Sequence, residues 1–91
     1  MTDKSEEKWI SVKVRYVNQV KEFRFNIHFN IRRVREEVVR AFNLRPPFDN
    51  YQLYWLKDST QIPLSDLNKS LLEYGIPDGA TLLLVHVHVV G

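Results

Sequence analysis

The apolar residues of this chain change their spacing along the sequence, and that change constrains the fold more than any other feature. Apolar and polar residues alternate over residues 9–16 and 22–28, which is typical of strands with one buried face. Between residues 31 and 42 the apolar side chains recur every three or four positions, as on one face of a helix. A third strand is expected at residues 51–56, and residues 81–89 form the most apolar segment, which is typical of a central strand. Strands on both sides of one helix predict an α+β domain.

Residues that favour turns and helix caps lie between these segments. Asn30 precedes the first apolar residue of the expected helix, where its side chain can accept a hydrogen bond from a backbone N–H. The helical region is expected to end before Pro46, because the residue ahead of a proline is pushed out of the helical conformation. Residues 17–19 are expected to form a tight turn between the first two strands. A proline limits residues 61–64 to a short strand at a sheet edge.

Length and composition exclude several classes of protein. The 91 residues are enough for one small domain, and 44% of them are apolar, as in folded globular proteins. The chain has no cysteine, which excludes disulfide scaffolds and thiolate sites and favours an intracellular, cytoplasmic setting. No apolar run reaches the ~20 residues of a membrane span. Residues 1–8 are polar and of mixed charge, so we expect a flexible N-terminal tail followed by one domain over residues 9–91.

The charged residues are distributed unevenly although the formal net charge is only +2. Residues 9–45 contain nine bases and three acids, whereas residues 46–91 contain two bases and five acids. This asymmetry predicts a basic face for an acidic partner. The acidic second half and the absence of a nucleic-acid readout motif argue against nucleic acid as that partner.

The segment from Leu67 to Leu84 carries the residues that indicate a family. A leucine turn, an aromatic residue, Gly75, Ile76, the turn Pro77-Asp78-Gly79 and a Thr-Leu strand follow one another in this order. This order resembles the end of a ubiquitin-like β-grasp domain, and the Pro-Pro loop after the helix is similar to that of ubiquitin. The resemblance implies a mixed four- to five-stranded sheet with strand order two-one-five-three and one main helix packed across it.

Within that superfamily, three features resemble the ubiquitin-like subdomain at the N-terminus of talin and kindlin FERM heads. They are Trp9 ahead of the first strand, the segment 50–55 and the turn from Leu72 to Ile76. The resemblance implies a cytoskeletal or adhesion adaptor that binds an active, GTP-bound small GTPase of the Rap or Ras type. In such complexes the two sheets join edge to edge, and basic side chains meet GTPase carboxylates. The residues expected at this site lie on the hairpin and the helix start: Lys13, Arg15, Lys21, Arg24, Arg32 and Arg33.

The two arginines at the helix start also have a structural interpretation. The N-terminus of a helix carries partial positive charge and favours acidic residues there, so Arg32 and Arg33 oppose the local dipole. Glu36 and Glu37 follow at a spacing of four residues and can compensate them as ion pairs. Both interpretations, a partner site and an internally compensated helix, are open at this point.

A second candidate surface is apolar. If Leu82 and Leu84 face the helix, alternation along the last strand places its other apolar residues on the outer face of the sheet. By analogy with ubiquitin, this face would bind a ubiquitin receptor or a neighbouring domain. An exposed apolar patch usually marks such a contact. The residues of this alternative site are Tyr54, Leu83, Val85 and Val87.

No catalytic or cofactor site is expected. The sequence contains no nucleophile paired with a base, no phosphate-binding glycine loop and no cluster of catalytic carboxylates, which indicates a non-enzymatic protein without cofactors. His86 and His88 share a strand face but lack a third ligand, so no metal site is predicted. A Phox/Bem-type module and contact of the basic face with an anionic membrane are further alternatives. As an isolated domain the chain is expected to be a monomer.

Overall fold

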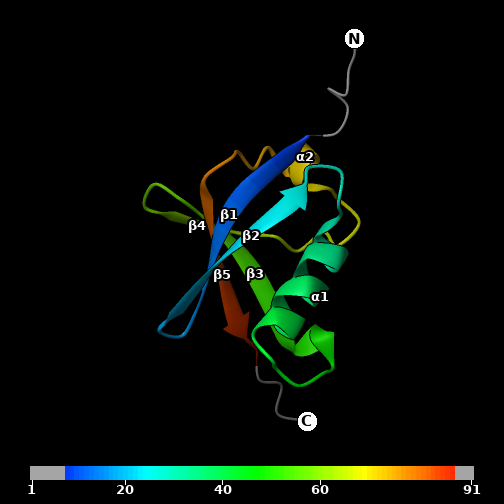
Figure 1. Cartoon of the computed structure of the whole chain (residues 1–91), viewed down its shortest axis with the longest axis vertical. Helices are drawn as coiled ribbons and strands as arrows, with labels where there is room; N and C mark the ends of the chain where they lie inside the picture. The colour runs from blue at the N-terminus through cyan, green and yellow to red at the C-terminus, as the bar shows by residue number, and fades with distance from the viewer. Residues whose placement is uncertain (1–7, 88–91) are drawn as a thin grey trace.

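The computed structural model describes residues 8–87, which form a five-stranded sheet crossed on one face by one main helix (Figure 1). The predicted N-terminal tail therefore lies outside the described residues except for Lys8. The elements in chain order are β1 Trp9–Tyr16, β2 Gln19–Asn26, α1 Ile31–Ala41, the 3-10 turn η1 Phe48–Asn50, β3 Tyr51–Lys57, β4 Thr60–Pro63, α2 Leu71–Tyr74 and β5 Ala80–His86.

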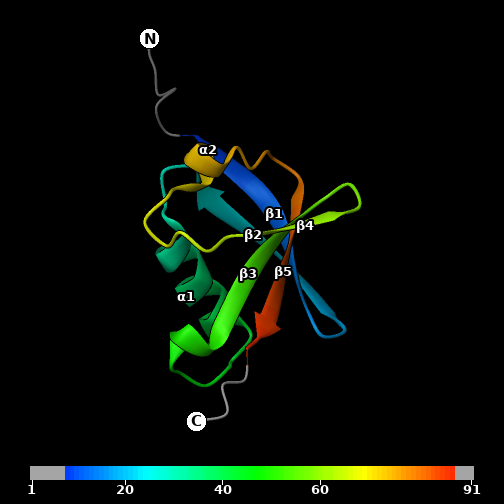
Figure 2. The same cartoon turned by 180° about the vertical axis from the view of Figure 1, so that it is seen from behind.

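The strand order across the sheet is β2-β1-β5-β3-β4. β1 and β5 are parallel, and the other neighbouring strands are antiparallel. The predicted α+β class and the order two-one-five-three are confirmed, and the short proline-containing segment joins the sheet as its outermost strand beside β3 (Figure 2). The most apolar strand, β5, lies in the middle of the sheet as predicted. Its predicted last residues, His88 and Val89, lie outside the described residues.

The first hairpin is longer and its turn is tighter than the sequence suggested. β2 begins at Gln19 rather than at residue 22, because the ladder with β1 continues without a bulge from Trp9 opposite Asn26 up to the turn. Val17 in that turn adopts a φ of 57°. This left-handed conformation is uncommon for a β-branched side chain.

Helix α1 begins where the capping signal predicted and ends earlier than expected. The Asn30 side chain accepts a hydrogen bond from the Arg33 N–H at 2.9 Å, which satisfies one free donor of the first turn. The helix ends at Ala41, well before the prolines, because Asn43 adopts a left-handed φ of 58°. The N–H groups of Asn43 and Leu44 then donate to helix carbonyls at 3.0 Å each, the arrangement of a Schellman C-cap.

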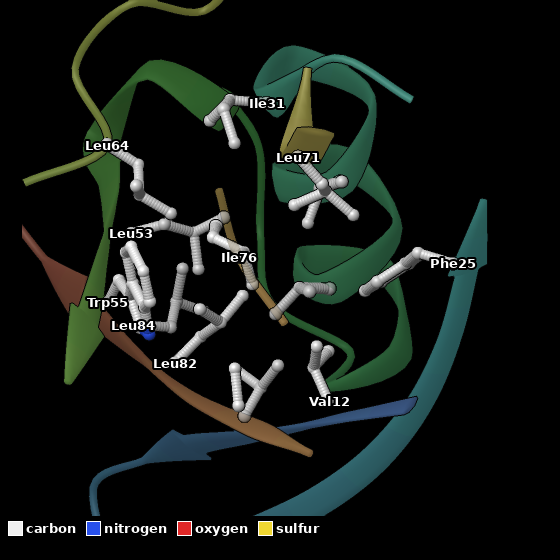
Figure 3. Close-up of a cluster of buried hydrophobic side chains, with 14 of the residues drawn as sticks. Val12, Phe25, Ile31, Leu53, Trp55, Leu64, Leu71, Ile76, Leu82 and Leu84 are labelled. Atoms are coloured by element: carbon white, nitrogen blue, oxygen red, sulfur yellow. The ribbon is translucent and has the colours of Figure 1, made fainter. Parts of the chain in front are cut away.

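The hydrophobic core lies between α1 and the covered face of the sheet (Figure 3). The helix contributes apolar side chains at three- and four-residue spacing, and the strands contribute every second residue. Leu82 and Leu84 of β5 face this core, which meets the condition on which the apolar candidate site depends. The fully buried side chains include Val12, Val14, Phe25, Ile31, Val34, Val38, Leu53, Leu64, Leu71 and Leu82. The opposite face of the sheet is not covered by any helix of the described residues.

One charged residue, Arg35, lies buried in the middle of α1. Its guanidinium donates to the Asp49 carboxylate at 3.0 Å and to the Tyr51 carbonyl at 3.4 Å. These bonds connect the helix to η1 and to the start of β3. Arg35 therefore contributes to the fold and does not face the candidate site.

Candidate protein interaction site

Strand β2 is one edge of the sheet, and its backbone has a partner on one side only. The N–H of Ile27 donates to the carbonyl of Lys8 at 3.0 Å, which extends the β1–β2 ladder by one pair. Because bonded and non-bonded pairs alternate in an antiparallel ladder, the odd-numbered residues of β2 bond to β1. The even-numbered backbone groups therefore point away from the sheet, at Val20, Glu22 and Arg24.

The hydrogen bonds of β1 support this assignment independently. The Ser11 N–H donates to the Asp78 carboxylate at 2.7 Å, and the Ser11 carbonyl accepts from the Gly79 N–H at 2.7 Å. Both groups of Ser11 thus point toward β5 and away from Arg24, its neighbour on β2. In the part of the chain that the structure describes, no turn, cap or side-chain bond uses the backbone groups of Val20, Glu22 or Arg24. The edge is open over these three residues.

The side chains of β2 divide between the two faces of the sheet. Arg24 lies on the open face, together with Val20 and Glu22. On the helix side, Phe23 stacks on Phe25 with ring centroids 5.4 Å apart, and the Lys21 ammonium lies 5.7 Å from the Phe42 ring. A chain that bound along this edge would meet Arg24 on one face and Lys21 on the other.

The six basic residues predicted for the partner site do not form one continuous patch. Lys13, Arg15 and Arg24 lie on the open face of the sheet, while Lys21 lies on the helix side. Lys13 is directly opposite Glu22, so its charge is balanced by a neighbour. Arg32 and Arg33 belong to the first turn of α1, which follows the C-terminal end of β2. All six residues lie on β2, on the neighbouring strand β1 or at the start of α1.

At the helix start, Arg33 is held in place by two contacts. Its Nε lies 3.0 Å from a Glu37 carboxylate oxygen, and its guanidinium lies 3.8 Å above the Phe29 ring. Phe29 in turn meets Trp9 edge to face at 5.6 Å, and Trp9 is 43% exposed. The predicted compensation by Glu37 is confirmed, whereas no ion pair between Arg32 and Glu36 is present in the described part of the chain. Sequence reasoning missed the Trp9–Phe29–Arg33 stack, because it joins three separate elements.

The apolar candidate site lies on the open face and adjoins the basic one. Leu83 is directly opposite Tyr54 on β3, and on its other side it pairs with Arg15 of β1, which in turn opposes Val20. Four strands thus contribute one row across the sheet. Tyr54, Leu83 and Val85 are half-buried, because neighbouring side chains on the same face cover part of each. Val87 is 39% exposed but follows the end of β5.

Several solved structures have the same arrangement of sheet and helix as this chain. The C-terminal ubiquitin-like domain of mouse tubulin-specific chaperone e superposes with a TM-score of 0.81 at 15% identity, covering 100% of this chain and 99% of that one. A ubiquitin-like domain from Arabidopsis thaliana gives a TM-score of 0.76 at 20% identity, covering 90% of this chain and 81% of that one. Ubiquitin of Caldiarchaeum subterraneum gives 0.72 at 18% identity, covering 92% and 100%.

The fold is ubiquitin-like. At these identities the likeness shows the fold alone, and neither a protein-family model nor a curated protein matches the chain. None of the three structures is a talin or kindlin domain, so that narrower resemblance stays a prediction.

The remaining candidates in this ubiquitin-like domain concern metals and membranes. Among residues 8–87 no three His, Cys, Asp or Glu side chains lie close enough together to hold a metal ion. His86 packs its ring 5.0 Å from that of Tyr51, and His88 lies outside the described residues. No helix within residues 8–87 is both long and apolar enough to cross a membrane.

Proposed function

We propose that this domain is a non-enzymatic interaction module whose partner is a GTP-bound small GTPase of the Rap or Ras type. The observation that supports this proposal is the open edge of β2, with free backbone groups flanked by Arg24 and Lys21. An edge strand of the GTPase would add to β2 by main-chain hydrogen bonds. Acidic residues of its effector loop would then meet the bases on both sides of the new strand pair.

The basic residues contribute differently to this contact. Arg24 lies on the edge strand itself, and Arg15 extends positive charge across the open face, whereas the charge of Lys13 is balanced by Glu22. Arg33 is already oriented by Phe29 and Glu37, so little side-chain entropy is lost when an acidic group binds it. Arg32 is exposed beside it.

The resemblance to talin and kindlin subdomains extends the proposal to the cellular setting. A domain of that kind would act in the cytoplasm, within a cytoskeletal or adhesion adaptor. The GTPase would recruit or orient that adaptor only in its active state.

The proposal is tested by an amide chemical-shift titration of the isotope-labelled domain with a Rap-type GTPase. We expect shifts along β2 and the start of α1 when the GTPase carries a non-hydrolysable GTP analogue, and none when it carries GDP. The double reversal Arg24→Glu with Arg33→Glu should weaken binding by about 2–3 kcal/mol in total. Lys57→Glu, a charge reversal at the end of β3, is the matched control and should bind normally. Equal binding of the double variant, or silence with both nucleotide states, would overturn the proposal.

The row on the open face favours a second candidate function, binding of a ubiquitin-receptor-type protein or a neighbouring domain. Leu83 and Tyr54 lie side by side on a face that no helix of residues 8–87 covers. Tyr54→Ala and Val85→Ala should then reduce binding while added salt has little effect, because apolar contacts are not screened. Binding through β2 predicts the reverse, with strong salt dependence and little effect of either alanine variant.

A further inference from the structure

The β2 edge carries charged residues, including Lys21, but its backbone lacks the features that usually prevent one sheet from pairing with another. Natural edge strands are commonly short, interrupted by proline or distorted by a bulge. β2 has eight residues, contains no proline or glycine, and pairs with β1 without a bulge. The backbone of β2 can therefore pair with a second β2 strand. The charges on the strand decide whether that pairing is favourable.

We propose that a second copy of this chain binds at the β2 edge, antiparallel to the first and related to it by a two-fold axis at Phe23. In such a dimer the outward-facing backbone groups of Glu22 and Arg24 bond to those of Arg24 and Glu22 in the second copy. The two sheets then form one continuous sheet across the axis. A two-fold contact of this kind closes on itself and stops at the dimer.

The charges select this register over its neighbours. With the axis at Lys21, Glu22 or Arg24, each of those residues would lie directly opposite its own copy, and like charges opposite each other are destabilising. With the axis at Phe23, Glu22 lies opposite Arg24 of the second copy, and the same pair forms again on the other side of the axis. In this register the central charges of the two β2 strands form two opposite-charge pairs.

The side chains on both faces also fit the Phe23 register. Phe23 is half-buried and belongs to the rings packed around the core, so its copy at the axis would cover its remaining exposed surface. Residues opposite each other in a non-hydrogen-bonded pair have the closest side chains, and Phe23 occupies such a pair in this dimer. On the open face, Lys13 already lies opposite Glu22, so charges would alternate from Lys13 through Glu22 to the Arg24 of the second copy.

This inference does not rest on the proposed GTPase function, although it uses the same edge. One strand pair is a small contact, and small interfaces are weak and transient. The domain is therefore expected to be a monomer in dilute solution, as the sequence suggested, and to dimerise as its concentration rises. A partner strand bound at β2 would compete with the second copy.

Sedimentation equilibrium of the untagged domain, from micromolar to millimolar protein, tests the proposal. We expect the average mass to rise from monomer toward dimer and not beyond. Glu22→Arg and Arg24→Glu should each weaken dimerisation by about tenfold or more, since each turns both charge pairs into like-charge pairs. The double swap, Glu22→Arg with Arg24→Glu, restores opposite charges and should recover dimerisation. Gln61→Arg at the β4 edge is the control and should dimerise like the parent chain.

Several results would overturn the dimer. They are a monomer at every concentration, single reversals that dimerise normally, a double swap that does not recover, and a mass that exceeds the dimer. The last result would indicate head-to-tail pairing of β2 with another edge. Amide spectra of each variant establish that it is folded. Because the GTPase titration is performed on dilute protein, loss of one interaction is distinguishable from loss of the other.

Discussion

The two edges of this sheet differ in almost every feature that controls strand pairing. β2 has eight residues, all paired with β1, and within residues 8–87 the outward backbone groups of Val20, Glu22 and Arg24 have no partner. β4 has four residues and ends at Pro63, which has no N–H to offer a partner. The chain then leaves the sheet through Leu64, which is fully buried and whose N–H donates to the Leu53 carbonyl at 2.9 Å.

This difference indicates where a partner strand can bind. A short edge that ends in proline is one of the ways in which proteins prevent unwanted pairing. The β4 edge is protected in this way, and the β2 edge is not. Positive charge gathers around β2 as well, so the open edge and the basic residues coincide. The comparison therefore favours β2 as the interaction edge for both proposed partners, the GTPase and a second copy.

The largest expected effect comes from proline at neighbouring positions of β2. Lys21→Pro removes an N–H that bonds to β1 and leaves a strand carbonyl without its donor, so it should lower the free energy of unfolding by about 2–3 kcal/mol. Glu22→Pro removes an N–H that faces solvent and should cost about 1 kcal/mol or less. Both side chains are exposed, which makes the pair well matched. Chemical denaturation measures the difference, and equal losses would show that the backbone groups do not alternate as described.

A smaller effect on the free energy of unfolding is expected from substitutions in the turns of the two hairpins. Val17, which precedes β2, and Asp58, which precedes β4, have nearly the same φ, 57° and 56°. Aspartate tolerates this conformation far better than a β-branched residue, and Val17 is 73% exposed and so gains little from packing. Val17→Gly should raise the free energy of unfolding by about 1 kcal/mol, and Asp58→Val should lower it by a similar amount. A Val17→Gly variant that is less stable than the parent chain would contradict this reading of the turn.

The smallest effect concerns the ion pair at the helix start. Glu37→Gln removes the partner of Arg33 in an exposed pair and should cost about 0.5 kcal/mol or less. It should also tighten binding of an acidic partner at the β2 edge at low salt, because Arg33 is released and one negative charge is lost. Isothermal titration at two salt concentrations measures both changes. Weaker binding would place Glu37 itself in the contact.

The sequence predicted the features that depend on side-chain pattern. Alternation located the strands, and three- and four-residue spacing with Asn30 located the start of α1. The order of residues from Leu71 to Thr81 indicated the fold. These predictions succeeded because a buried face imposes its period on the chain.

The features that the pattern did not predict depend on backbone geometry or on contacts between distant segments. β2 starts at Gln19, where the side chains are exposed and no apolar period is visible. α1 ends at a left-handed Asn43 rather than at the prolines. The stack of Trp9, Phe29 and Arg33 and the direction of the free groups on β2 require the register of β1 against β2.

Residue-resolved amide hydrogen exchange of the dilute domain tests most directly whether β2 is an open edge. Slow exchange is predicted at Lys21, Phe23 and Phe25, whose N–H groups bond to β1, and fast exchange at Val20, Glu22 and Arg24. Raising the protein concentration, or adding the GTP-loaded GTPase, should slow exchange at the three even-numbered positions. Equal protection of all six amides in dilute protein, or no added protection with either occupant, would contradict the assignment of β2 as the interaction edge.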